Sequence, residues 1–145
     1  MVNIKFTKLA ADVKTPEYAT PHASGMDVFA IEDVPVTPGS ITMAKTGLKV
    51  EIPEGWEIQV RPKSGLALKG LTVVNSPGTV DCDYRGEIGV ILGNLGSEPI
   101  VLEKGKKIAQ LVVCPVEQGK YVDIEVVEEL TDTDRGEGGF GSTGE

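Results

Sequence analysis

The sequence predicts an all-β domain, a barrel or a jelly-roll-like fold, with one short helix. In several short runs apolar and polar residues alternate with a period of two, which is typical of half-buried strands. The 145 residues include 18 glycines and 9 prolines, which favours many turns between short strands over long helices. Aromatic residues make up 5% of the chain, so Val, Ile and Leu are expected to build a single core.

Three runs show the alternation most clearly. They are the N-terminal run with Val2, Ile4 and Phe6, the run with Trp56, Ile58 and Val60, and the run Tyr121–Val127 with Val122, Ile124 and Val126 on one face. Turn signals such as Ser76-Pro77-Gly78 separate the runs. The one helix expected is Gly65–Lys69, with Ser64 as its N-cap and Gly70 at its end.

The last residues differ in composition from the rest. From Thr131 to Glu145 the apolar period is lost and glycine is dense, so this tail has too few apolar residues to dock permanently. We therefore expect a β domain over residues 1–130 and a mobile glycine-rich tail over residues 131–145.

The net charge of −8 argues against a nucleic-acid surface, because duplex binding needs clustered Lys and Arg. No apolar run could span a bilayer and no signal-peptide pattern is present, so we expect a cytoplasmic protein with no membrane partner, with a nuclear or organellar location also open. Cys82 and Cys114 are expected to be reduced, buried thiols, and a single His leaves too few ligands for a zinc site.

Residues 136–143 read GEGGFGST and match the spacing of the dinucleotide-binding glycine fingerprint. They also nearly match a P-loop. Both matches are rejected, because Ser142 replaces the P-loop Lys and no helix can follow. Composition alone fits a disordered tail equally well. Phe140 among glycines, with Arg135 before it and Thr143 after it, favours a flap that closes over a base and a phosphate chain.

The stretch RPKSGLALKG, residues 61–70, combines a strand-breaking Pro62 with the start of the short helix. Backbone N–H groups, the Ser64 hydroxyl and the charge of Arg61 could bind an anion there. A surface turn with a capping serine is the commoner meaning of such a stretch when it stands alone.

The stretch NSPGTVDCDYRGEIGVIL, residues 75–92, places a polar cluster where a strand begins. Alternation puts Asp81, Asp83 and Arg85 on the face opposite Val80 and Tyr84. Paired carboxylates could bind a metal or act as a base, and a solvated acidic edge strand is the alternative. Asp27 in ASGMDVFA and Gln110 in GKKIAQLVV are single polar residues in apolar strands, and such residues usually face water.

Together, in this order and spacing, the five stretches resemble the motifs of homotrimeric dUTPases, and they span residues 23–144. The resemblance implies a jelly-roll-like (β-clip) domain in a three-fold trimer with a swapped C-terminal arm. Active sites would lie between subunits, each covered by a tail from a neighbour. The implied reaction is hydrolysis of dUTP to dUMP and pyrophosphate, which limits uracil incorporation into DNA and supplies dUMP for thymidylate synthesis.

The resemblance also assigns roles to individual residues. Asp81 would be the general base that activates water for attack on the α-phosphorus, and Tyr84 would lie against the deoxyribose and exclude a 2′-hydroxyl. Asn75 and the backbone of the Asn75–Asp83 hairpin would read uracil. That hairpin includes the substrate-binding residues Gly78, Thr79 and Val80.

The phosphates would be held by the remaining matched positions. Ser64, Gly65, Lys63 and Gln110 would bind them, with Arg61 supporting that site and Asp27. From the tail, Phe140 would stack on uracil while Arg135, Gly138, Gly141, Ser142 and Thr143 surround the β- and γ-phosphates. Mg²⁺ would ride on the triphosphate and keep several waters, since no carboxylate cage is evident. Met26 stands where the family more often carries Tyr or Leu, Thr79 replaces an aliphatic residue, and Lys63 stands where Arg is common. These departures concern tuning and not the reaction.

Two other functions compete with this interpretation. A dCTP deaminase has a similar fold, but there we expect a glutamate base and a different surrounding motif. A trimeric binding protein could keep the fold without turnover, and the presence of Asp81, Tyr84 and the tail argues against it. Release of pyrophosphate rather than ammonia would separate these possibilities.

Overall fold

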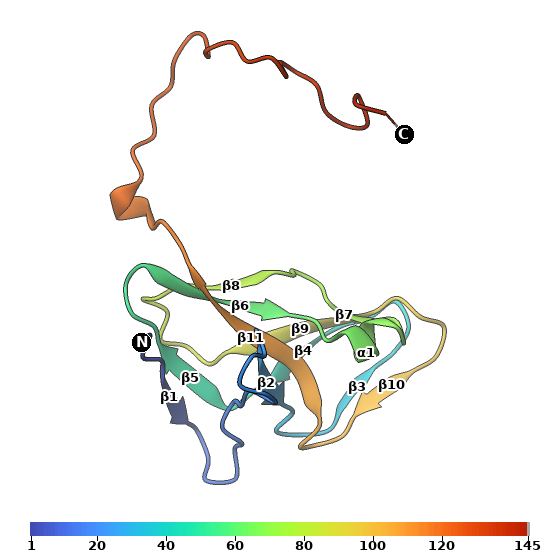
Figure 1. Cartoon of the computed structure of the whole chain (residues 1–145). Helices are drawn as coiled ribbons and strands as arrows, with labels where there is room; N and C mark the ends of the chain where they lie inside the picture. The colour runs from blue at the N-terminus through green and yellow to red at the C-terminus, as the bar shows by residue number, and fades with distance from the viewer. Residues whose placement is uncertain (145) are drawn as a thin grey trace.

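Short antiparallel strands make up most of the protein, whose computed structural model describes residues 1–144 (Figure 1). The strands are β1 (Lys5–Lys8), β2 (Met26–Phe29), β3 (Val34–Val36), β4 (Ile41–Lys45), β5 (Leu48–Glu51), β6 (Trp56–Arg61), β7 (Leu71–Val73), β8 (Gly78–Val80), β9 (Gly89–Asn94), β10 (Ile100–Leu102) and β11 (Lys107–Pro115). The helical segments are α1 (Ser64–Ala67) and the 3₁₀ turn η1 (Gly119–Tyr121). The predicted all-β class with one short α-helix is confirmed.

The strands form four sheets, in the orders β2-β11-β6-β8, β4-β9-β7, β1-β5 and β10-β3, and every pairing is antiparallel. In the largest sheet, β11 joins β2 to β6, so segments some 80 residues apart in the chain become neighbours. In β6 buried residues alternate with half-buried ones from Ile58 onward, and Leu111 on β11 lies opposite Val60. Ile58, Val60 and Leu111 are buried on the inner face, where a fully buried Leu contributes about 1.5–3 kcal/mol.

The run Tyr121–Val127 was predicted to be a strand, and this prediction is wrong for the chain by itself. After η1 no residue up to 144 belongs to a strand. Ile124 and Val126 are 85% and 95% exposed. The chain leaves the sheets here and extends away from them (Figure 1), so no strand edge of its own lies alongside. We call residues 122–144 the C-terminal arm.

Smaller differences concern the ends of the chain and the thiols. The N-terminal run starts its strand only at Lys5, and Val2 is exposed. Cys82 and Cys114 are free, as expected, but half-buried instead of buried, because each lies at the margin of the core. The predicted boundary at residue 130 stays a prediction. Within residues 1–144, no helix is long and apolar enough to cross a membrane.

Candidate functional site

Strand register brings three of the predicted residues into one row across the largest sheet. Asp27 on β2 lies opposite Gln110 on β11, and Gln110 lies opposite Arg61 on β6. Residues directly opposite in antiparallel strands project from the same face. Asp27 is buried, whereas the other two are half-buried on the polar face of the sheet. Three stretches that are separate in the sequence therefore meet at one place.

Two lysines neutralise the buried Asp27 carboxylate. Lys63 Nζ contacts Oδ1, and Lys107 Nζ lies 2.7 Å from Oδ2. Burial by itself raises the pKa of Asp27, but the hydrogen bonds and charges of Lys107 and Lys63 outweigh it, so the pKa lies below its ordinary value. Asp27 is therefore ionised at neutral pH and fixes Lys63 beside the short helix. Sequence reasoning missed Lys107, which reaches Asp27 next to a register shift in β11.

Arg61 was expected to support the phosphate site and Asp27; within residues 1–144 it makes no contact with Asp27, and its role at the phosphates stays a prediction. Its Nε and Nη2 donate to Gln59 Oε1 at 3.0 and 2.6 Å, so the guanidinium lies along its own strand. Residues two apart on a strand share a face, which makes Gln59 the nearest acceptor. Lys63 takes the place at Asp27 instead.

The start of α1 carries free backbone donors. Ser64 is the first helical residue and not the cap; Lys63 occupies the cap position and makes no side-chain cap bond. The Lys63 carbonyl accepts from the N–H groups of Leu66 and Ala67. The N–H groups of Ser64 and Gly65 have no acceptor within residues 1–144, and a side chain at Gly65 would meet nothing within 4 Å. They are open to an anion. Gly70, at φ +95°, ends the helical turns as predicted.

Gln110 is locked against this helix start. Its Nε2 donates to the Pro62 carbonyl at 2.9 Å. A Cβ on Gly25 would lie 2.4 Å from Gln110 Oε1, so only glycine leaves room for the amide there. Gly25 is a second residue that the sequence reasoning missed; its position in the flexible turn before Asp27 was the available signal. We call Asp27, Lys63, Ser64, Gly65 and Gln110 the anion group.

The predicted Asn75–Asp83 hairpin is not a paired hairpin. Strand β7 pairs with β9 while β8 pairs with β6, so the two strands lie in different sheets. Each lies at the edge of its sheet, with one strand neighbour, so the backbone groups on its other side are not used by sheet pairing. The connection between them places the exposed Asn75 over Gly78, where a Cβ would lie 3.0 Å from Asn75 Nδ2.

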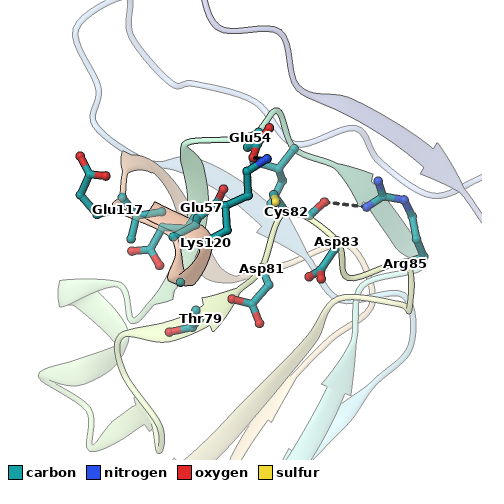
Figure 2. A pocket seen from close by; sticks show the side chains of 13 residues that line it. Glu54, Glu57, Thr79, Asp81, Cys82, Asp83, Arg85, Glu117 and Lys120 are labelled. Atoms are coloured by element: carbon teal, nitrogen blue, oxygen red, sulfur yellow. Dashed lines mark hydrogen bonds and ion pairs between the residues drawn. The ribbon is translucent and has the colours of Figure 1, made fainter. Parts of the chain in front are cut away.

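The carboxylates after β8 lie on a turn and not on a continued strand. Strand β8 ends at Val80, and the Tyr84 N–H donates to the Asp81 carbonyl at 3.1 Å. The predicted alternation over Asp81–Arg85 is therefore wrong, because the turn breaks the period. Arg85 Nη1 donates to the Cys82 carbonyl at 2.7 Å and closes the turn (Figure 2). We call residues 81–85 the Asp81 turn.

The Asp81 turn borders an open cavity of about 790 Å³. In Figure 2, Thr79, Asp81 and Asp83 lie on β8 and its turn, next to the segment after β11 that carries Glu117 and Lys120. Asp81 is exposed and can reach water. The hydroxyl of the partly exposed Tyr84 donates to the Glu87 carbonyl at 2.9 Å, which holds the ring over Gly86. The turn thus offers a carboxylate and a fixed aromatic ring.

The anion group and the Asp81 turn lie at opposite ends of β6. Val80 is opposite Ile58 and Gly78 is opposite Val60, so the next residue, Asp81, lies toward the start of β6. The anion group follows the other end of β6, beyond Arg61. Four strand residues separate these ends by about 13 Å. One chain therefore does not bring its carboxylate to its own anion group.

The tail residues reach neither place in their own chain. Arg135 Nε donates to the Gly138 carbonyl at 2.7 Å, within the arm itself. Phe140 is fully exposed, and the stretch 141–143 follows it in the last part of the arm, which extends away from the sheets (Figure 1). Among residues 1–144, no three His, Cys, Asp or Glu side chains converge to hold a metal ion.

Known proteins resemble this chain over nearly its whole length. The dUTPase family model matches residues 11–144. The chain is 52% identical to the deoxyuridine 5'-triphosphate nucleotidohydrolase of Alkaliphilus metalliredigens, with 99% of each chain covered. It is 55% identical to the protein of that name from Chlamydia muridarum, with 97% of each covered. The solved Staphylococcus bacteriophage 80alpha dUTPase with dUpNHpp superimposes with a TM-score of 0.85 at 28% identity and 98% coverage of each chain.

Proposed function

This chain belongs to the dUTPase family and hydrolyses dUTP to dUMP and pyrophosphate, and we propose that it does so as a homotrimer whose active sites are shared between subunits. The observation that carries the trimer is the separation of the Asp81 turn from the anion group along β6. A base must lie within hydrogen-bond reach of the attacking water, and the phosphate donors must lie at the same phosphate. A gap of about 13 Å is too long for that, so a second subunit supplies one of the two.

The exposed arm supports the same arrangement. Ile124, Val126 and Leu130 are each at least 85% exposed, and apolar residues grouped in this way mark an interaction surface. A swapped arm would bury them on a neighbouring subunit. It would also bring the tail over a site that its own core does not form.

In the proposed site, Asp81 takes a proton from the water that attacks the α-phosphorus. The new bond joins the water oxygen to that phosphorus, and the bond to the oxygen bridging the α- and β-phosphates breaks, so pyrophosphate leaves. Tyr84, held over Gly86, packs against the deoxyribose and leaves no space for a 2′-hydroxyl. Asn75 and the backbone of Gly78, Thr79 and Val80 hydrogen-bond the uracil edge.

The anion group of the neighbouring subunit holds the phosphates. Its free Ser64 and Gly65 N–H groups, Lys63 and Gln110 supply donors, and Asp27 orients Lys63. Mg²⁺, when bound with the triphosphate, would supply positive charge that stabilises the leaving pyrophosphate. Asp27 is already paired with two lysines and no carboxylate cage converges within residues 1–144, which fits a Mg²⁺ ion bound mainly to substrate and water.

The tail of a neighbour completes the site. Phe140 stacks on uracil, while Arg135, Gly138, Gly141, Ser142 and Thr143 enclose the β- and γ-phosphates and exclude water. The protein is proposed to act in the cytoplasm, without nucleic-acid or membrane partners.

Mixed trimers test the shared site. Asp81→Asn subunits and subunits lacking residues 131–145 should each be nearly inactive. The two kinds of subunit are co-expressed with different tags and purified together as mixed trimers. A site is active only when its base comes from a truncated subunit and its tail from an Asp81→Asn subunit. If both are supplied at random, about a quarter of the sites should be active. No recovery in trimers of verified mass would show that base and tail come from one subunit. A measured mass other than that of three chains would contradict the proposed trimer.

The substrate specificity is tested on the same preparation. Pyrophosphate release without ammonia is expected from dUTP, and dCTP, dTTP and UTP should react about 10⁴-fold less efficiently because they leave buried hydrogen-bonding groups unmatched or do not fit. Comparable turnover of dCTP or UTP would contradict the assigned uracil and deoxyribose contacts.

A further inference from the structure

A groove beside α1 is positively charged in a protein whose net charge is −8. The groove has a volume of about 880 Å³, and its lining includes five lysines and two glutamates. Two of the lysines, Lys63 and Lys107, are paired with Asp27. The other three, Lys14, Lys69 and Lys106, are exposed and have no carboxylate partner among residues 1–144.

The groove also has an apolar floor. Phe29, Leu66, Ile100 and Leu102 line it beneath the lysines. Lys14 Nζ lies 4.8 Å above the Phe29 ring and donates to the Gly105 carbonyl, so its charge is held at the rim. The surface therefore suits an extended segment that carries both carboxylates and apolar side chains.

The start of the C-terminal arm has this composition. Residues 123–134 contain six carboxylates and neither Lys nor Arg: Asp123, Glu125, Glu128, Glu129, Asp132 and Asp134. Ile124, Val126 and Leu130 are interspersed among them and exposed. The arm leaves its own core near Glu54, which contacts Lys120 and accepts a hydrogen bond from the Tyr121 hydroxyl. Glu54 lies just before the start of β6, whereas α1 follows the other end of that strand.

We infer that residues 123–134 of one copy dock in the lysine groove of a second copy and so deliver Arg135 to that copy's anion group. Gly65 and Lys63 line the same groove, and Arg135 follows the last carboxylate directly. Lys14, Lys69 and Lys106 are thus positioning residues for the tail. This inference rests on the proposed trimer and names the surface that guides tail closure.

A charge-swap cycle in the full-length protein tests this docking. Lys69→Glu/Lys106→Glu and Glu128→Lys/Glu129→Lys should each raise KM for dUTP, and Kd for dUpNHpp, about 3- to 10-fold. The effect on kcat should be smaller, because the reacting groups are unchanged. The four substitutions combined should return both constants close to wild type. Lys45→Glu/Lys49→Glu, on exposed lysines outside the groove, is the matched control and should change neither constant.

Two outcomes would overturn the inference. If the groove lysines attract the triphosphate directly, arm reversal will lower KM and the combination will rescue nothing. The second outcome comes from trimers mixed from the groove variant and the arm variant. If the arm docks on a second copy, about half of the sites regain a groove and an arm of opposite charge, and KM falls toward wild type. If the arm docks on its own subunit, every site stays mismatched and KM does not recover. Light scattering on each variant shows whether its mass is still that of three chains. An activity loss that accompanies loss of the trimer concerns the proposed function, and one in an intact trimer concerns the docking surface.

Discussion

The β core (residues 5–115) and the C-terminal arm differ in what covers their apolar side chains. Leu111 on the central strand β11 is fully buried between β2 and β6, whereas Leu130 in the arm is 87% exposed. The core is complete within one chain, and the arm is not. The proposed chemistry divides in the same way, with Asp81 on the core and Phe140 on the arm. Stability should therefore depend on the core, whereas turnover should depend on both regions.

The largest expected effect belongs to the core side of the site. Asp81→Asn keeps the side-chain shape but removes the proton acceptor, so kcat should fall about 10²–10⁴-fold. Steady-state pyrophosphate release measures this. Glu117→Gln, at an exposed carboxylate of the same cavity, is the matched control and should stay near wild type. Wild-type turnover by an intact Asp81→Asn trimer would exclude Asp81 as the base.

Deletion of residues 131–145 tests the arm side. The core should remain folded and trimeric, while turnover falls about 10²-fold or more because several phosphate donors are lost together. Circular dichroism and light scattering check the fold and the mass, and pyrophosphate release checks activity. A truncated trimer with full activity would make the tail a disordered end without a role.

Stability should depend on the core. Leu111→Ala removes a fully buried side chain and should lower the free energy of unfolding by about 2–5 kcal/mol in denaturant titrations. Leu68→Ala, at a position 91% exposed, should change it by less than about 0.5 kcal/mol. Equal losses at the two positions would mean that Leu68 is covered in the assembly.

A smaller effect is expected from Phe140→Ala. Stacking of a ring on a base contributes about 1–3 kcal/mol, so the affinity for dUpNHpp should fall less than it does in the deletion. Calorimetry measures both proteins. An unchanged Kd would show that Phe140 does not contact the base.

The smallest effect concerns pH. The pKa of Asp27 is lowered in the folded state. The ionised Asp27 therefore contributes fully to the free energy of unfolding when the pH is above the ordinary pKa of an Asp carboxyl. This contribution is lost as the pH falls through the lowered pKa. One proton gives a slope of at most about 1.4 kcal/mol per pH unit. Below about pH 4 the unfolding free energy of Asp27→Asn should therefore fall less steeply than that of wild type. Asp12→Asn, which removes an exposed pair, should resemble wild type. Equal slopes in wild type and Asp27→Asn would contradict the buried pairing.

The candidate site could be predicted from its motifs, but not its internal contacts. The roles of Asp81 and the tail followed from a resemblance over nearly the whole chain. Lys107 could not have been assigned to Asp27, because the register shift in β11 decides where its side chain lies. The same holds for Arg61, whose nearest acceptor, Gln59, is set by the conformation of its own strand.

The sequence by itself determined the strand periods, the frequent turns and the single short helix, because alternation, glycine and proline act over a few residues. Only the tertiary structure decided which strands pair. It separated β7 from β8 and gave β6 two partners, while Tyr121–Val127, with the same alternation as β6, has none. The physical reason is that a period of two makes a segment able to pair, whereas the hydrogen bonds of a sheet need a neighbouring edge that distant parts of the chain, or another chain, must supply.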